Sequence, residues 1–179
     1  HSIFIGSQAG RDNNTGAGCI YIGPNAAKQS TVSGRNIAIG SNAAAEYIDT
    51  GVNGQNIFVG DETAAGLTNG VQNIGLGANA LCEAGNVNST IAIGFEAGKV
   101  IGNRAVSAGG DANRNIIMGY QSASSGDINS DNILVGTQVA QHADNPIGFT
   151  DILFMGTRAG HNANLSVGSV AIGNANRVG

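Results

Sequence analysis

The feature that most constrains this chain is a short segment that recurs along its whole length. Most copies read polar–Ile–x–apolar–Gly, as in NIAIG ending at Gly40 and TIAIG ending at Gly94. Successive copies are 17, 17, 20, 17, 17, 25, 17, 20 and 17 residues apart, so a 17-residue unit is kept and insertions of three or eight residues are added to it. The copies end at Gly6, Gly23, Gly40, Gly60, Gly77, Gly94, Gly119, Gly136, Gly156 and Gly173. A fixed unit with localised insertions is typical of a solenoid.

Each unit predicts one strand followed by turns. The residues one and three positions before the Gly share a face of the strand because strand side chains alternate, and most are Ile or Val, which suit strands. The Gly permits a bend that a Cβ would oppose. A small residue three positions later, such as Ala43 or Ala97, marks the expected start of a second short strand, and a stretch rich in Gly, Asn and Ser then turns the chain back.

Such a coil cannot bury its apolar face alone, so we expect the coils to stack. At about 4.8 Å per coil they form a rod roughly 45–50 Å long. The sequence therefore predicts an all-β, parallel β-roll or β-solenoid of about ten 17-residue coils, in a single repeat domain over residues 1–179. Asn recurs four residues before the Gly, for example at Asn56 and Asn73, and stacked Asn residues are expected to form side-chain amide ladders.

The middle residue of each strand, two before the Gly, is the basis for predicting an assembly. We expect it to point away from the coil's own core, yet it is almost always apolar. A strand that is apolar on both faces is buried on both faces, most simply against another copy of the chain. A wider core within one chain is the alternative. The predicted homotrimer interface comprises Phe4, Tyr21, Ala38, Phe58, Ala92, Ile117, Leu134, Phe154 and Ala171.

The units NIAIGSNAAA (36–45), NIGLGANAL (73–81) and TIAIGFEAG (90–98) resemble the head repeats of trimeric autotransporter adhesins, the YadA-like head, and the similar units of bacteriophage tail fibres and tailspikes. The resemblance covers nearly the whole chain. It implies a left-handed parallel β-roll, three of which pack about a threefold axis into a stiff fibre. Autotransporter head units are typically shorter than 17 residues, and this difference favours a phage tail fibre or spike for host attachment over a bacterial adhesin head.

The chain starts without Met and inside a repeat, so we interpret it as a fragment of a longer fibre, on a virion or a bacterial cell surface and therefore extracellular. The eight basic residues are scattered and the net charge is −4, which argues against a nucleic-acid partner. There is no run of 18 apolar residues, which argues against membrane insertion. Cys19 and Cys82 occupy different repeat positions and are expected to be free thiols.

No cofactor, metal or catalytic role is predicted. The GxGxxA match from Gly75 to Ala80 belongs to the repeat and lacks the helix that a dinucleotide site needs. His142 and His161 lie about one coil apart, but we interpret them as solvated loop residues, as is His1. Asp127, Asn129 and Asp131 resemble half of a calcium loop without its Gly and final Glu.

Two alternative activities remain open in the sequence. A glycan-degrading spike needs paired carboxylates, for which Glu46 with Asp49 and Glu83 with Glu96 are candidates. An ice-binding solenoid needs a regular outward ladder of Thr, whereas Thr occurs here at no constant repeat position.

Three segments are longer than the repeat requires: Ala45–Gly54, Lys99–Arg114 and Gln141–Thr150. Binding residues tend to lie on extra loops of a rigid scaffold. Tyr47, Ile48, Pro146 and Phe149 are therefore the candidate contacts for a host cell-surface glycan or protein, the alternative being that these loops only cover the edges of the apolar stripe.

Overall fold

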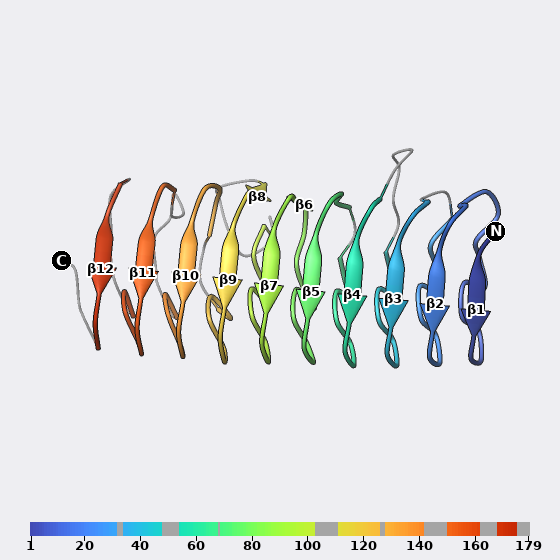
Figure 1. Cartoon of the computed structure of the whole chain (residues 1–179), viewed down its shortest axis with the longest axis horizontal. Coiled ribbons are helices and arrows are strands. Elements are labelled where there is room, and N and C mark those ends of the chain that lie inside the picture. The colour runs from blue at the N-terminus through green and yellow to red at the C-terminus, as the bar shows by residue number, and fades with distance from the viewer. Residues whose placement is uncertain are drawn as a thin grey trace.

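In the computed structural model the chain is a rod built from one long parallel sheet (Figure 1). The structure describes residues 1–31, 34–47, 54–67, 69–102, 111–125, 128–141, 150–161 and 168–174. These residues form strands and turns and contain no helix. The fold is thus an all-β parallel solenoid, as the repeat predicts.

The main sheet has ten strands in the order β1-β2-β3-β4-β5-β7-β9-β10-β11-β12. Their bounds are β1 Ile3–Ile5, β2 Ile20–Ile22, β3 Ile37–Ile39, β4 Ile57–Val59, β5 Ile74–Leu76, β7 Ile91–Ile93, β9 Ile116–Met118, β10 Ile133–Val135, β11 Leu153–Met155 and β12 Val170–Ile172. Two further strands, β6 (Val87–Asn88) and β8 (Ala112–Asn113), pair with each other in a small parallel sheet. Each strand of the main sheet immediately precedes a repeat Gly.

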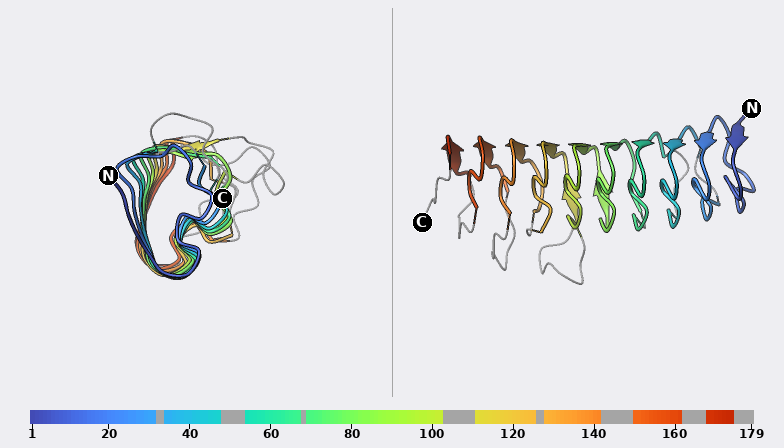
Figure 2. Two further views of the ribbon diagram at one scale, coloured as in Figure 1. Left: turned by 90° about the vertical axis from the view of Figure 1, so that its right-hand side faces the viewer. Right: turned by 90° about the horizontal axis from the view of Figure 1, so that it is seen from below.

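The register of the main sheet is the same at every step, including across the insertions. Ile37 pairs with Ile57 across the first insertion, Ile91 with Ile116 across the second, and Ile133 with Leu153 across the third. The expectation that the insertions lie between strands and leave the unit fixed is therefore confirmed. Seen down the rod, successive coils superimpose in outline (Figure 2).

The segment after each repeat Gly is a run of turns, so the expected second strand at the small residue is not formed. Backbone φ is positive at alternate positions, for example 57° at Asn25 and 48° at Ala27. The backbone N–H of Ala27 donates to the carbonyl of Ala43 in the next coil at 2.8 Å, while that of Lys28 donates back to Asn25 at 3.1 Å. Hydrogen bonds between coils and within turns thus satisfy this segment without a strand.

The interior of the rod is lined by the middle residue of each strand. The expectation that this side chain points away from the coil's own core is therefore wrong. Tyr21, Ala38, Phe58, Ala92, Ile117, Leu134, Phe154 and Ala171 are all buried within their own chain, at no more than 4% exposure. They pack against the small residues of the turn segment, such as Ala43 and Ala97, which are also buried. Since these side chains fill the coil, they cannot form the surface of an interface with another copy. Phe4, in β1, is 42% exposed and stacks on Tyr21 with ring centroids 4.9 Å apart.

A ladder of buried Asn side chains runs along the rod at the position four before the Gly. The backbone N–H of Asn56 donates to Asn36 Oδ1 at 2.9 Å, and that of Asn73 donates to Asn56 Oδ1 at 2.9 Å. The same contact recurs from Asn132 N–H to Asn115 Oδ1, where the Asn132 amide also donates at 3.0 Å. The expected ladder is confirmed, but most of its steps join a side-chain carbonyl to the next coil's backbone.

The repeat Gly is required by the spacing of the coils. At Gly77, φ is +123°, and an added Cβ would lie 2.6 Å from the carbonyl oxygen of Gly94 in the next coil. The same arrangement holds from Gly6 to Gly156, each facing the following repeat Gly. A side chain here would combine backbone strain with a collision against backbone that cannot move aside.

Replacing Gly77 with Ala is expected to lower the free energy of unfolding by about 2–4 kcal/mol, because strain and collision add. The matched control is Gly168→Ala, where φ is +81° but nothing lies within 4 Å of the added Cβ. That change costs strain alone, about 1 kcal/mol. Urea unfolding followed by circular dichroism measures both, and equal losses would contradict the role of the coil contact.

Replacing Asn73 with Ala is expected to cost about 2–4 kcal/mol, because two buried backbone groups lose their partners. Its Oδ1 accepts from Thr90 N–H at 3.0 Å and its Nδ2 donates to Val87 carbonyl at 2.6 Å. The control is the neighbouring exposed Gln72→Ala, which is expected to change stability by less than about 0.5 kcal/mol. Comparable losses in the two variants would show that the ladder adds nothing to stability.

Candidate interaction surface

The outer face of the main sheet is a continuous strip of aliphatic side chains. It is formed by the residues one and three before each repeat Gly, which were expected to be the core. Many are well exposed, including Ile57 at 37%, Ile133 at 42% and Met155 at 40%. We call this surface the aliphatic strip; its members are Ile3, Ile5, Ile20, Ile22, Ile37, Ile39, Ile57, Val59, Ile74, Leu76, Ile91, Ile93, Ile116, Met118, Ile133, Val135, Leu153, Met155, Val170 and Ile172.

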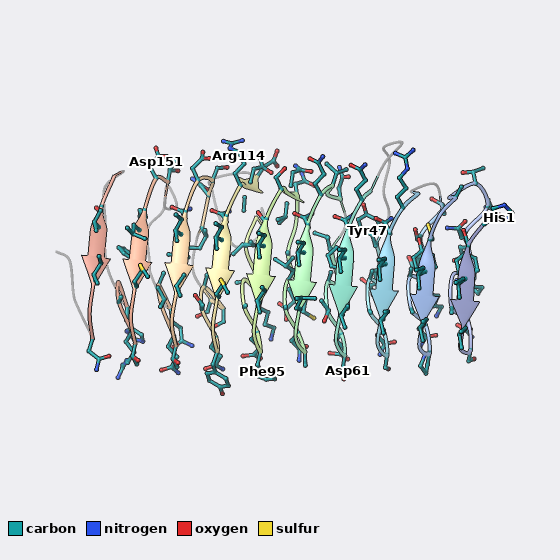
Figure 3. All side chains as sticks on the ribbon, in the orientation of Figure 1. His1, Tyr47, Asp61, Phe95, Arg114 and Asp151 are labelled. Carbon is teal, nitrogen blue, oxygen red and sulfur yellow. The ribbon has the colours of Figure 1, made fainter. Side chains whose placement is uncertain are left out.

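Polar side chains border the aliphatic strip along one edge and along part of the other (Figure 3). On one edge, five residues before the Gly, Gln72 Nε2 donates to Gln55 at 3.4 Å, and Arg114 pairs with Asp131, Nε to Oδ1, at 2.6 Å. The hydrogen bonds from Arg114 lower the pKa of Asp131 below its usual value. On the other edge, directly after the Gly, lie exposed residues such as Asp61 and Thr137. An apolar centre with a polar rim is the anatomy of a protein–protein interface.

The size of the strip distinguishes it from ordinary exposed apolar residues. It crosses all ten strands of the main sheet, a length of about 43 Å at the usual strand spacing. Monomeric soluble proteins rarely expose contiguous apolar patches larger than a few hundred Å². A parallel sheet is moreover normally covered on both faces. The strip is therefore the part of the described surface that most requires a covering layer.

Of the four residues proposed from sequence as receptor contacts, the structure describes only Tyr47. Tyr47 is buried at 1% exposure, so its expected role as an exposed contact is wrong. Its ring packs edge-on against Phe58 with centroids 6.2 Å apart, and its hydroxyl donates to the Gly70 carbonyl at 2.5 Å. Ile48, Pro146 and Phe149 lie outside the described residues.

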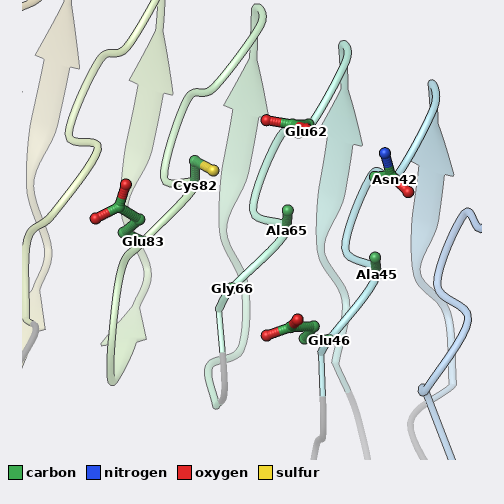
Figure 4. Close-up of a pocket in the computed structure, with 8 residues that line it drawn as sticks. All are labelled: Asn42, Ala45, Glu46, Glu62, Ala65, Gly66, Cys82 and Glu83. Atoms are coloured by element: carbon green, nitrogen blue, oxygen red, sulfur yellow. The ribbon is translucent and has the colours of Figure 1, made fainter.

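A pocket of about 330 Å³ opens on the turn segments beside β3, β4 and β5 (Figure 4). Small residues, among them Ala45 and Ala65, make room for it, and three carboxylates surround it. Its lining residues are Asn42, Ala45, Glu46, Glu62, Ala65, Gly66, Cys82 and Glu83. The pocket is acidic, but its carboxylates are spread over three coils.

One of the two carboxylate pairs considered for glycan cleavage, Glu83 with Glu96, lies around a lysine. Lys99 Nζ lies 3.4 Å from Glu83 Oε1 and 3.6 Å from Glu96 Oε1, so both carboxylates of this candidate pair share one cation. Glu46 lines the pocket, whereas its sequence partner Asp49 lies outside the described residues.

The described residues contain no group of three His, Cys, Asp or Glu side chains placed to hold a metal ion. His1 and His161 are described, while His142 and Asp127 are not. Asp131 of the half calcium loop is engaged by Arg114, and the carbonyl of Asn129 accepts from Asn115 Nδ2 at 2.7 Å.

The two cysteines are free thiols, as expected, with Cys19 buried and Cys82 half-buried. Burial raises the pKa of Cys82, and the nearby carboxylates of Glu62 and Glu83 raise it further, while Lys99 opposes them.

Comparison with known proteins adds no relative: no protein-family model matches the chain, and neither a curated protein nor a solved structure is significantly similar to it. Within the described ranges, the chain has no helix long and apolar enough to cross a bilayer. The likeness to trimeric fibre repeats therefore rests on the repeated segments themselves.

The raised pKa of Cys82 predicts slow alkylation. At pH 8, iodoacetamide is expected to react with Cys82 several-fold more slowly than with a free cysteine, because less thiolate is present. In a Cys19→Ala background, Glu62→Gln with Glu83→Gln is expected to lower the pKa and speed the reaction. The control is Glu46→Gln, which lines the same pocket without raising the Cys82 pKa. A rate unchanged by the double substitution would show that the carboxylates do not act on the thiol.

Proposed function

We propose that this chain is a structural, adhesive segment of a surface fibre in which three copies pack their aliphatic strips about an axis parallel to the rod. The observation that carries the proposal is the strip itself, apolar at both outward positions of every strand in the main sheet. Its burial in an assembly would remove a large apolar area from water, which is the main driving force of obligate association.

A second copy of the chain fits the strip better than an unrelated partner. The strip keeps one register along the rod, so the outward rows of two parallel copies match coil by coil. Symmetric self-association places identical rows opposite one another without any further sequence requirement. The number three comes from the resemblance to autotransporter heads and phage fibres, in which three β-rolls surround an axis.

The proposed assembly has the properties of a surface fibre. Three rods packed along their length form a stiff fibre whose aliphatic strips are covered, suited to spacing and presenting contacts at a cell surface. The length of the unit and its insertions favour a phage tail fibre or spike that takes part in host attachment, in an extracellular setting. A bacterial trimeric adhesin head is the alternative, and it shares the same assembly. We assign no catalytic role.

The native mass tests the assembly. We expect three times the 17.8 kDa of one chain in native mass spectrometry at micromolar concentration. Ile57→Asp together with Ile116→Asp is expected to give monomers, because each would bury unpaired carboxylates at the axis at a cost of several kcal/mol. Both side chains are 37% exposed in the single chain, so the coil itself tolerates the change.

The matched control is Gln55→Asp, which adds the same charge at the exposed polar edge of the strip. This variant should keep the mass of the wild type. A wild-type mass of 17.8 kDa would overturn the proposal. A trimer that survives both Ile substitutions would show that another surface joins the copies.

A further inference from the structure

Outside the aliphatic strip, two exposed aromatic rings lie side by side. Phe95 follows Gly94, just after β7, and Tyr120 follows Gly119, just after β9, so the two residues lie in adjacent coils. The rings are 41% and 50% exposed and are stacked, with centroids 5.5 Å apart and planes 15° apart. Apart from Phe4 in β1, they are the exposed large apolar side chains that the described residues carry beyond the strip. We call them the aromatic pair.

Stacking leaves one face of each ring without a ring against it. On the side of Phe95 opposite Tyr120 lies the coil of β5, where the equivalent residue is Ala78. One coil further, the equivalent residue is the exposed Asp61. Asp61 and Phe95 lie at the same end of their strands in Figure 3, two coils apart, which corresponds to about 9.6 Å. Only the methyl group of Ala78 thus lies in this row between the ring of Phe95 and the carboxylate of Asp61.

A fixed line of polar groups runs beside the aromatic pair, along the coils of β7, β9 and β10. Gln121 Nε2 donates to Glu96 Oε2 at 2.8 Å, and Gln138 Nε2 donates to Gln121 Oε1 at 3.2 Å. Glu96 is also held by Lys99 at 3.6 Å. These residues each follow the row of the aromatic pair by one position, so acceptors and donors are already oriented beside the rings. Fixed partners reduce the ordering cost of binding.

We propose that the face of Phe95, the opening over Ala78 and the carboxylate of Asp61 bind a β-linked hexopyranose of a cell-surface glycan. In a β-linked glucose- or galactose-type ring, the axial C–H bonds at C1, C3 and C5 share one face. That face carries partial positive charge and matches the negative face of an aromatic ring. The hydroxyls then reach the carboxylate of Asp61, two coils from Phe95, and that of Glu96, in the same coil as Phe95.

A protein partner fits this place less well. Stable protein interfaces bury about 800 Å² per partner around an apolar centre, whereas two rings bordered by charged and amide groups offer far less. A sugar ring needs one flat apolar face with polar groups at its rim, which is the composition found here. The proposal deepens the proposed function, on which it rests, by naming the glycan class that a host-attachment fibre would contact.

Saturation-transfer NMR on the intact chain tests the site, with cellohexaose and a β-1,4-linked galactan oligosaccharide as probes. We expect saturation at the axial H1, H3 and H5 protons of at least one probe. Phe95→Ala is expected to weaken its binding about tenfold, the effect of losing one aromatic stack. Phe95→Tyr should retain binding because the face is kept. Ala78→Arg should abolish it by filling the opening.

The matched control is Thr157→Ala, an exposed residue of the same row beyond Tyr120 and Thr137. It should bind as the wild type does. Absence of saturation with both probes, or unchanged affinity in Phe95→Ala, would overturn the site. Loss of the native mass in Phe95→Ala would also overturn it, since the rings would then belong to the interface between copies.

The native mass of the wild type separates this proposal from the previous one. A trimer that binds neither probe overturns the glycan site alone. A monomer that binds a probe through Phe95 overturns the assembly alone and leaves the site in place.

Discussion

The contact between the backbones of successive repeat glycines sets the geometry of the whole rod. Coils joined by a parallel ladder lie about 4.8 Å apart, and at a φ near +125° no Cβ fits between Gly77 and the carbonyl of Gly94. Every other position inherits this spacing and its constant register. A residue type that recurs at one position therefore stacks on itself, which produces the buried Asn ladder inside the rod and the rows of Ile outside it.

Constant register also sets what the interior tolerates. The middle strand position varies in size from coil to coil, and a small residue there gives a neighbouring ring room. Phe58 lies between Ala38 and Gly75, and a Cβ on Gly75 would approach its ring at 3.1 Å. The outer rows face no such limit and stay uniformly aliphatic. Variation inside and uniformity outside are thus two results of one spacing.

The same contrast explains how much the sequence predicted. Strand positions, parallel register, the Asn ladder and the location of the insertions follow from the period, because each depends only on spacing along the chain. Which face of each strand points into the rod did not follow from the period. Both faces are apolar, so alternation alone cannot choose between them. Two signals in the sequence favoured the observed choice. First, Asn73 shares a face with Gly75, and a stacked Asn needs partners from a buried backbone, so this face points inward. Second, only the middle position varies in size from Gly to Phe.

The aromatic pair could not be predicted from the period for a related reason. Phe95 and Tyr120 are 25 residues apart, separated by the longest insertion, and they become neighbours only because the register resumes unchanged at Ile116. A repeat protein gains stability from rows in which one residue type recurs at the same repeat position. It can gain specificity only where the residue type in a row changes. The row directly after the repeat Gly can change in this way, because the coil spacing requires no particular residue type there. A binding function on this rod therefore belongs where two unlike residues of that row meet, next to a position as small as Ala78.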